Sequence, residues 1–241
     1  ENVCPYCGYA VNSVQSKLYL TQGIVLKGRY LTGKMIKRNV DSAVYIGYDI
    51  RSEKVVEIRE FLPERVSKRD GGSLQVLAQD EYRDIFREYL QSFTQLWKNL
   101  MRFRGLPALM DVNDVFSAFS TAYAVTDHND STTFRKILDS VNIEENPMPY
   151  EKAKALVSSI LSTVESLHTA NVVHRGISPD TLVLSSDGNL KLTGFAIPQV
   201  RTSKNRIISS ICDGYGAIEQ YDFNWQQGSW TDTYAIGVLL Y

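Results

Sequence analysis

Hydrophobic and polar residues alternate over several short stretches of the chain, which is the pattern of β-strands that bury one face. β-Branched and aromatic residues are frequent in these stretches, and the turn-forming run Arg38-Asn39-Val40-Asp41 separates the first two. Three stretches lie close together, which predicts an antiparallel meander, and two more follow later. The predicted strands are 30–36, 43–48, 54–59, 112–116 and 121–125.

A second pattern, in which apolar residues recur about 3.6 positions apart, predicts helices. One long helix covers 81–102, and a second begins after Pro149. Two short strands follow the second helix, at 181–184 and 190–192. A sheet followed by helices and a small hairpin predicts an α+β fold in two lobes. The apolar stripe predicted for the second helix is Leu156, Val157, Ile160, Leu161, Val164 and Leu167.

Composition narrows the class of protein. The 241 residues include 26 Lys+Arg and 27 Asp+Glu, a formal net charge of −1, which argues against nucleic-acid binding because phosphates attract a basic surface. We interpret the basic run at 201–206 as a solvated face. No apolar run reaches the roughly 18 residues of a membrane span, so we expect no membrane segment in this fragment. The chain opens without Met and closes within an apolar stretch, so we expect it to be a piece of a longer polypeptide.

The cysteines favour a metal site over disulfides. Three residues, Cys4, Cys7 and Cys212, make a poor disulfide framework and indicate a cytoplasmic protein. Cys4 and Cys7 form a C-x-x-C turn typical of a zinc knuckle, which supplies two of the four ligands of a structural zinc site. We therefore expect a half-site that is completed by ligands upstream of Glu1. The alternatives are unliganded cysteines in a disordered tail and a redox pair.

Five short motifs follow one another along the chain. They are VEIR at 56–59, HRGISPDT at 174–181, KLTGFA at 191–196, GYGAIEQY at 214–221 and WTDTYAIG at 230–237. In this order they resemble V-A-I-K, the catalytic loop H-R-D-x-x-x-x-N, K-L-x-D-F-G, G-Y-x-P-P-E-Q-Y and W-T-D-x-Y-x-x-G of bacterial eukaryotic-type serine/threonine protein kinases. The leading CPYCG also resembles the N-terminal zinc ribbon that some of these kinases bear.

The resemblance implies a fold and a division of the chain. It implies the two-lobed protein-kinase fold, with the hinge near 126–128 and a C-lobe truncated after the helix that begins near Asp232. The expected parts are a half zinc-ribbon knuckle at 1–10, a linker at 11–27, an N-lobe at 28–127 and an incomplete C-lobe at 128–241. The N-lobe is expected to hold the antiparallel sheet and one long helix.

The residues that perform phosphoryl transfer in this family are replaced here. The catalytic Asp corresponds to Gly176, and the Asn that holds a second magnesium ion corresponds to Thr181. The magnesium-binding Asp of D-F-G corresponds to Gly194. The Lys that grips the phosphates corresponds to Arg59, and its helix partner Glu corresponds to Ser92. No catalytic residue is therefore intact, and we expect no cofactor for catalysis.

The nucleotide pocket that the resemblance implies is also altered. The glycine-rich hairpin falls on 37–42, which contains no glycine, so side chains hinder the approach of phosphates to the backbone. The small Ala above the adenine ring corresponds to Glu57, which places a carboxylate against an apolar base. We predict weak or absent binding of ATP and magnesium. The degenerate pocket consists of Val44, Glu57, Arg59, Thr126, Asp127 and Val183.

The motif residues that remain favour an architectural role. In the family, His174 and Phe195 stack with hydrophobic residues, and Asp232 holds the backbone of the catalytic loop. Glu219 pairs in the family with an Arg of the last helices, which this chain lacks, and Arg175 can receive a phosphate from the activation segment. We assign these five residues to structure.

The predicted function is therefore that of a pseudokinase, a kinase fold that acts as a regulatory or protein-binding module in bacterial signalling. Its partner is expected to be a protein, which the sequence does not identify. One alternative is a divergent active serine/threonine kinase that transfers phosphate from ATP, with Arg59 gripping the phosphate and Asp180 or Asp213 taking over catalysis. Another is a zinc-ribbon interaction protein whose kinase-like part is a spacer.

Overall fold

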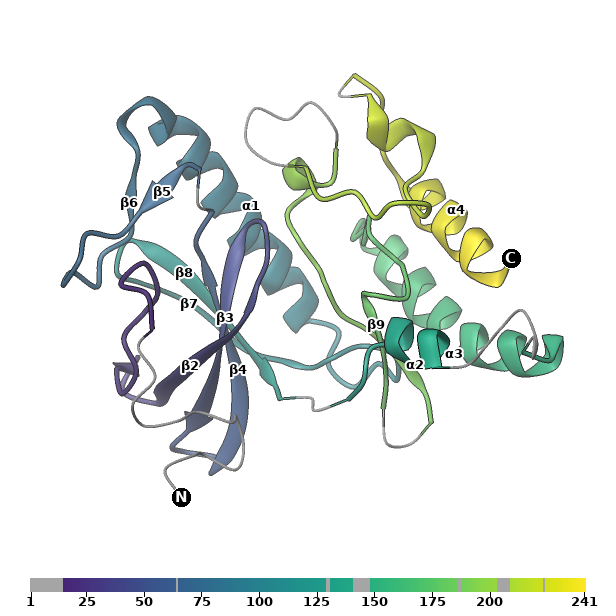
Figure 1. Ribbon diagram of the computed structural model, residues 1–241, viewed down its shortest axis with the longest axis horizontal. Helices are drawn as coiled ribbons and strands as arrows, with labels where there is room; N and C mark the ends of the chain where they lie inside the picture. The colour runs from purple at the N-terminus through teal and green to yellow at the C-terminus, as the bar shows by residue number, and fades with distance from the viewer. Residues whose placement is uncertain are drawn as a thin grey trace. The chain divides into compact units, whose positions relative to one another are not determined.

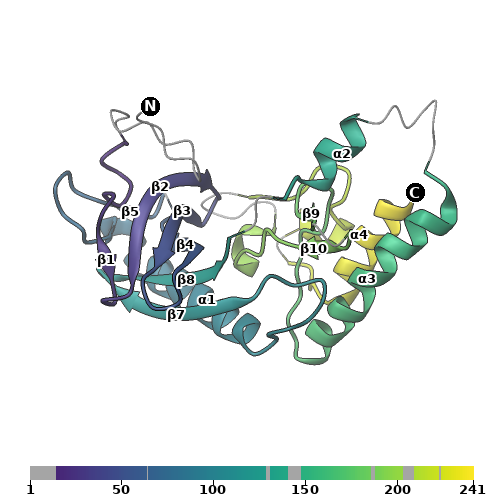
Figure 2. The same ribbon diagram turned by 90° about the horizontal axis from the view of Figure 1, so that it is seen from below.

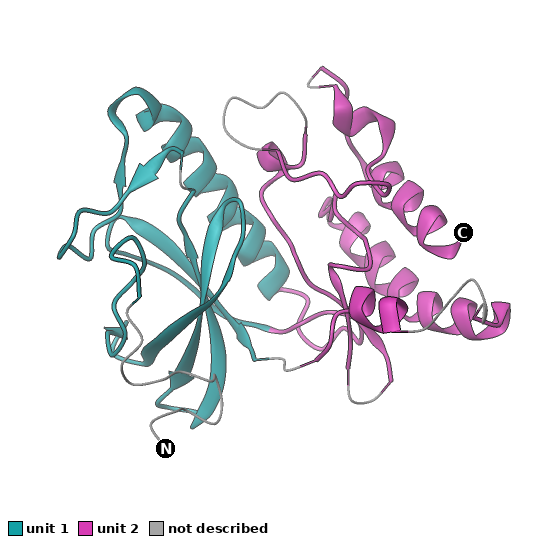
Figure 3. Ribbon diagram, in the orientation of Figure 1, with its two compact units in different colours: residues 1–101, 112–128 teal, residues 102–111, 129–241 magenta. Residues whose placement is uncertain are grey.

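The structure is a computed structural model that describes residues 15–63, 65–128, 131–140, 148–185, 188–202, 209–222 and 224–241. The chain divides into two compact units, which Figure 3 colours separately. Unit 1 comprises residues 1–101 and 112–128, and unit 2 comprises residues 102–111 and 129–241. Cys4 and Cys7 lie outside the described residues, so the zinc half-site stays a prediction.

Unit 1 is built on a six-stranded antiparallel sheet in the order β1-β2-β3-β4-β8-β7 (Figure 1). Its strands are β1 (Val25–Leu26), β2 (Tyr30–Arg38), β3 (Ser42–Asp49), β4 (Lys54–Phe61), β7 (Val112–Ala118) and β8 (Thr121–Asp127). A separate hairpin pairs β5 (Ser67–Lys68) with β6 (Leu77–Ala78). The five strands predicted for this part of the chain are confirmed. β1, β5 and β6 have two residues each and are too short to show alternation.

The long helix α1 (Arg83–Met101) covers one face of this sheet and packs against β7 and β8 (Figure 2). It begins slightly later than predicted because Asp80–Tyr82 form a 3-10 turn, η1. The ring of Phe93 lies 5.3 Å from that of Phe61 on β4, centroid to centroid, and 6.0 Å from that of Trp97. Aromatic packing therefore fixes α1 on the sheet.

The described part of the predicted linker, residues 15–27, packs on unit 1. Leu20 is fully buried, and its amide donates to Tyr45 Oη at 3.0 Å. Gln15 Oε1 accepts a hydrogen bond from the Met35 amide at 2.9 Å. Burial and these bonds hold the segment against β2 and β3, so its described residues are an integral part of the unit.

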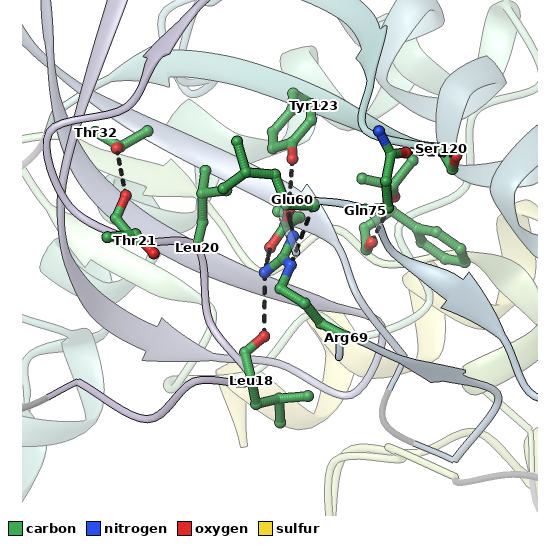
Figure 4. A network of polar contacts seen from close by, with 12 residues as sticks. Leu18, Leu20, Thr21, Thr32, Glu60, Arg69, Gln75, Ser120 and Tyr123 are labelled. Carbon is green, nitrogen blue, oxygen red and sulfur yellow. Dashed lines mark hydrogen bonds and ion pairs between the residues drawn. The ribbon is translucent and has the colours of Figure 1, made fainter. Parts of the chain in front are cut away.

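A buried carboxylate, that of Glu60 on β4, organises the polar interior of unit 1 (Figure 4). Arg69 donates to its two oxygens at 2.5 and 3.2 Å, and the hydroxyls of Tyr45 and Tyr123 donate to it at 2.7 and 2.6 Å. Arg69 also donates to the carbonyl oxygen of Leu18 at 3.1 Å, which includes the N-terminal segment in the cluster. Burial, together with the charge of Glu60, raises the pKa of both tyrosines, so their hydroxyls stay protonated. The buried charge is therefore paired and fully hydrogen-bonded.

Unit 2 combines helices with a two-stranded sheet of its own. Its elements are α2 (Phe134–Ser140), α3 (Tyr150–Thr169), β9 (Leu182–Leu184), β10 (Leu190–Leu192), the 3-10 turns η2 (Pro198–Val200) and η3 (Ile218–Tyr221), and α4 (Ser229–Leu240). α3 packs against α4 and β10. β4 and β9 lie in different sheets, as a two-lobed fold requires. Within the described residues, no helix is both long and apolar enough to cross a membrane.

The apolar stripe predicted for α3 contains one error. Leu161 is 47% exposed, whereas Ile160 and Val164 are buried. Successive helical residues are rotated by about 100°, which turns Leu161 away from the buried face. Thr163 is buried there in its place.

Candidate functional site

The carboxylate of Asp232 on α4 binds the backbone of residues 174–181, the segment that resembles the catalytic loop of kinases. Asp232 accepts hydrogen bonds from the amides of His174 and Arg175, at 2.8 and 2.7 Å, and from Nε2 of His168 at 2.8 Å. Burial opposes the charged form, but these donors hold the pKa of Asp232 below its ordinary value. The structure thus places Asp232 where an anchor of the loop backbone would lie.

The rings of His174 and Phe195 are in tilted contact, with 4.3 Å between their centroids and 56° between their planes. His174 Nε2 donates to the carbonyl oxygen of Thr193 at 2.8 Å, and Nδ1 accepts from the Gly176 amide at 3.2 Å. These partners define the neutral tautomer. Complete burial lowers the pKa of His174 to about 4, so the ring is uncharged near neutral pH. In this form the ring packs against Phe195 and bonds to the backbone of Thr193 and Gly176.

Gly176, the position of the catalytic Asp in the resemblance, lies against the guanidinium of Arg201. A Cβ at Gly176 would lie 2.6 Å from Arg201 Cζ, far inside van der Waals contact. Arg201 is only 4% exposed, and it donates to the carbonyl oxygens of Gly194 at 2.5 Å and Ser210 at 2.7 Å. Its Nη1 also lies 4.0 Å from Cys212 Sγ. The interpretation of the basic run as a solvated face is therefore wrong for Arg201, since it fills the space where a side chain at Gly176 would begin.

Thr181 and Gly194, the predicted magnesium-binding positions, lie against each other and close to Gly176. Thr181 Oγ1 donates to the Gly176 carbonyl oxygen at 2.7 Å and accepts from the Ser178 amide at 2.9 Å. Gly194 has φ +76°, and a Cβ there would lie 2.6 Å from Thr181 Cγ2. The three degenerate positions are thus brought together, and the Thr181 hydroxyl is committed to the loop itself.

The segment after the catalytic loop is fastened by Gln220, which the sequence analysis did not single out. Its Nε2 donates to the carbonyl oxygens of Arg175 and Arg201, both at 2.9 Å, and it is 2% exposed. Glu219 lies beside it and accepts a hydrogen bond from Thr231 Oγ1 at 2.6 Å. Gln220 and Arg201 could not be singled out because their partners are mostly backbone carbonyls, which leave no mark in a sequence.

In unit 1, four of the predicted pocket residues share one face of the sheet. Val44 on β3 lies directly opposite Arg59 on β4, and Glu57 on β4 lies opposite Thr126 on β8. Residues two apart on a strand point to the same side, so Glu57 and Arg59 project together. This is also the face from which Arg59 reaches α1.

Arg59 stands at the position that the resemblance gives to the phosphate-binding Lys, and it contacts other residues of unit 1. Its Nη1 donates to Ser42 Oγ at 3.0 Å, and its guanidinium lies 4.9 Å from the ring centroid of Trp97 on α1. Ser42 is fully buried and donates in turn to Asp41 Oδ1 at 2.8 Å. Ser92, the predicted partner position, lies on the same helix as Trp97. A cation–π contact and a hydrogen bond thus tie Arg59 to the hairpin and to α1.

Glu57 is paired as well. His128 Nδ1 lies 3.2 Å from Glu57 Oε1, and the two side chains are 16% and 25% exposed. Next to His128, Asp127 accepts a hydrogen bond from Asn113 Nδ2 at 2.7 Å. Val183 belongs to β9 of unit 2 and is buried. A polar pair therefore stands at the position that the resemblance gives to the small residue above the adenine ring.

The donor set of unit 2 does not fit a magnesium ion. Such an ion takes hard oxygen ligands, with at least one carboxylate in most nucleotide sites. Gly176 and Gly194 offer no side-chain oxygen, the Thr181 hydroxyl is used locally, and Arg201 adds a positive charge. Throughout the described ranges, no three His, Cys, Asp or Glu side chains gather closely enough to hold a metal ion.

The two carboxylates proposed for displaced catalysis lie elsewhere on unit 2. Asp180 is exposed, and its Oδ2 accepts from Arg135 Nη2 of α2 at 3.3 Å. Asp213 is also exposed. Neither is part of the Gly176–Arg201 arrangement.

Comparison with known proteins identifies relatives of this chain. The family description "Protein kinase domain" matches residues 74–241. The chain is 26% identical over 224 residues to serine/threonine-protein kinase PknL of Mycobacterium tuberculosis, covering 91% of this chain and 50% of that protein. It is 23% identical over 225 residues to CBL-interacting protein kinase 10 of Oryza sativa subsp. japonica, covering 91% of this chain and 44% of that protein. The chain thus spans about half the length of the curated relatives it matches.

A solved structure supports the same likeness. The chain resembles the structure titled "PpkA-294 apo form" with a TM-score of 0.75 and 26% identity, covering 92% of this chain and 77% of that one. The predicted α+β, protein-kinase-like fold is therefore confirmed. The residue roles inferred from the resemblance stay predictions.

Proposed function

Since the chain belongs to the protein kinase family, with serine/threonine kinases among its relatives, we propose that it is a kinase-like domain that does not transfer phosphate. It acts instead as a regulatory or protein-binding module in bacterial signalling. A fold shared with kinases does not by itself imply catalysis, which depends on the charged groups of the site.

The observation that carries this proposal is the chemistry of the catalytic loop. Phosphoryl transfer depends on positioned carboxylates and metal ions that neutralise developing charge. Gly176 and Gly194 provide no carboxylate, and the nearest charged group is the guanidinium of Arg201. A single loss of this kind can be rescued by a neighbour, but here the losses occur together at adjoining positions.

Unit 1 gives independent support for weak or absent ATP binding. Arg59 is engaged by Ser42 and Trp97, and Glu57 is paired with His128. A nucleotide would have to displace these contacts, and its base would meet a carboxylate that is already partly desolvated.

The alternative is a divergent active serine/threonine kinase, which the names of the relatives favour. It requires a carboxylate to reach the site of transfer from elsewhere. Asp180 is the nearest in sequence, and its carboxylate is bonded to Arg135. In this alternative, Asp180→Asn would abolish activity.

The test is transfer of labelled γ-phosphate from magnesium-ATP to the protein itself and to a general protein substrate, using the full-length protein that contains this chain. Arg59→Ala is the matched variant, and PknL is the positive control. We expect no transfer above background from the parent or the variant. Transfer by the parent that Arg59→Ala abolishes would overturn the proposal.

We further propose that Cys4 and Cys7 bind zinc together with ligands upstream of Glu1, because two thiolates leave half of a tetrahedral shell open. Elemental analysis of the 241-residue chain and of an upstream-extended chain tests this. Stoichiometric zinc in the extended chain alone is the expected result, and stoichiometric zinc in a monomer of the shorter chain would contradict it.

A further inference from the structure

Arg201 is a buried cation without a counter-ion. Only 4% of the residue is exposed, and its partners are two carbonyl oxygens, the Ser210 hydroxyl and the Cys212 thiol. Among the described residues it forms no ion pair, and its Nε is buried without a hydrogen-bond partner. Buried guanidinium groups are normally paired with a carboxylate because desolvation of the charge is costly. This one must therefore be held in place by the geometry around it.

That geometry depends on Gly176. The guanidinium carbon and both terminal nitrogens of Arg201 lie 2.6 to 2.8 Å from where a Cβ at Gly176 would stand. Gly176 has an ordinary φ, so its backbone does not call for glycine. Glycine is needed at position 176 because the guanidinium of Arg201 occupies the space that a side chain would fill.

Arg201 also joins two separate pieces of backbone. Nη2 donates to the Gly194 carbonyl oxygen at 2.5 Å, and Nη1 donates to the Ser210 carbonyl oxygen at 2.7 Å. The amide of Ser210 donates to the carbonyl oxygen of Val200, the residue before Arg201, at 2.7 Å. A planar fork with donors in fixed directions is suited to bridging two acceptors in this way. The segment 209–212 is thereby fastened to the residues beside the catalytic loop.

We propose that the guanidinium of Arg201 is an internal cation that takes the place of the catalytic carboxylate and its metal ion, excludes a divalent ion from this site, and fastens segment 209–212 to Gly194 beside the catalytic loop. The proposal rests on the proposed function, since it explains how the inactive arrangement is held together. A divalent ion beside this guanidinium would be repelled, and among the described residues no carboxylate is bonded to Arg201 to offset the repulsion. A side chain restored at Gly176 would force the guanidinium of Arg201 out of its present position.

The test is a double-mutant cycle between Gly176→Ala and Arg201→Ala, read by thermal unfolding of the full-length protein. Gly176→Ala adds only a Cβ, so it isolates the steric conflict from charge. With Arg201 present, overpacking predicts a fall in Tm of about 5 °C. With Arg201→Ala, the same change is expected to cost little or nothing, because the space is open.

Gly237→Ala on α4 is the control, since its φ is ordinary and a Cβ there meets nothing within 4 Å. This variant should not lower Tm in either background. An equal shift from Gly176→Ala in both backgrounds would overturn the proposal.

A second variant covers the case in which Arg201→Ala does not fold. Arg201→Lys keeps the positive charge but lacks the planar fork. Hydrogen exchange at the Ser210 amide is then expected to be at least about tenfold faster than in the parent, because the bridge to segment 209–212 is lost. Unchanged exchange would contradict the fastening role. Both readouts are independent of phosphate transfer, so activity in the parent would refute the proposed function without altering the coupling between Gly176 and Arg201.

Discussion

Each unit contains a buried arginine, and the two differ in whether a carboxylate balances the charge. Arg69 in unit 1 faces Glu60, and its side chain is 2% exposed. Two tyrosine hydroxyls complete the shell of that carboxylate. Arg201 in unit 2 is also buried, but within the described part of the chain its hydrogen bonds go to carbonyl oxygens, a hydroxyl and a thiol.

This difference in charge balance distinguishes residues that stabilise the fold from residues that determine what the site can bind. The Arg69–Glu60 cluster ties strands β3, β4 and β8 to the N-terminal segment, and its charges cancel. Arg201 stands uncompensated among positions where the family resemblance predicts carboxylates. Asp232 and His174 keep the framework of the catalytic loop around it. A retained motif residue therefore reports the fold, while the local balance of charge reports what the site can do.

The largest effect is expected from breaking the compensated cluster. Glu60→Gln removes the negative charge, keeps the shape, and leaves Arg69 buried without a counter-ion. We expect a loss of about 3 kcal/mol in the free energy of unfolding, measured by denaturant titration. The exposed pair Arg87–Asp84, with side chains 79% and 95% exposed, supplies the control: Asp84→Asn should change stability little.

A double variant sharpens this prediction. Adding Arg69→Met to Glu60→Gln removes the isolated cation, so part of the lost stability should return. If the double variant is less stable than Glu60→Gln alone by the full cost of Arg69→Met, the charge balance is not what holds the cluster together.

A smaller effect, in unit 2, depends on pH. Burial lowers the pKa of His174 to about 4, with further lowering by Arg201 and Arg175 and an opposing effect of Asp232. The unfolded chain takes up this proton first, near pH 6.5, so the contribution is fully present above that pH and is lost as pH falls toward 4. At pH 5 the expected loss from this residue is about 2 kcal/mol.

Comparison of the parent with His174→Gln isolates that contribution, because all other ionisable side chains are the same in both proteins. The difference in stability between parent and variant should shrink between pH 7.5 and pH 5, by about the 2 kcal/mol given above. A difference that stays constant over this interval would show that His174 is not held neutral by burial.

The smallest effect concerns the partly buried pair of Glu57 and His128 in unit 1. Glu57→Ala removes a carboxylate from the predicted pocket, and we expect nucleotide affinity to rise by about tenfold in calorimetry. His128→Ala is the matched variant, because it removes the partner of Glu57 and leaves the carboxylate, and it should not raise affinity. Micromolar ATP binding by the parent would contradict the pocket argument.

Much of the fold follows from the sequence pattern. Alternation predicts the five longer strands of the main sheet, and 3.6-residue periodicity predicts α1 and α3, because long regular elements with one buried face carry a strong signal. β1, β5 and β6 are not predicted, since two residues cannot show a period. The described part of the predicted linker packs through Leu20. Its apolar residues form two runs of three, 18–20 and 24–26, which show neither the strand period nor the helix period.

The site was less accessible to sequence reasoning. The motif order led directly to Gly176, Thr181 and Gly194, and the structure brings these three together. The sequence indicates a solvated position for Arg201 because two further basic residues, Lys204 and Arg206, follow it within five positions. Its burial depends on the space left by Gly176 and on the carbonyl oxygens of Gly194 and Ser210, and neither is visible in a pattern of residue types.

The measurement that most directly tests the central claim, that a guanidinium stands where the family resemblance implies carboxylates and a metal ion, is a titration with Mn²⁺ followed by electron paramagnetic resonance. The full-length protein is used with ADP present, in a Cys4→Ser, Cys7→Ser background that removes the predicted zinc knuckle. We expect no saturable Mn²⁺ binding at millimolar concentration beyond that of ADP alone. Binding of one Mn²⁺ per chain by the protein with Arg201 intact would contradict the account.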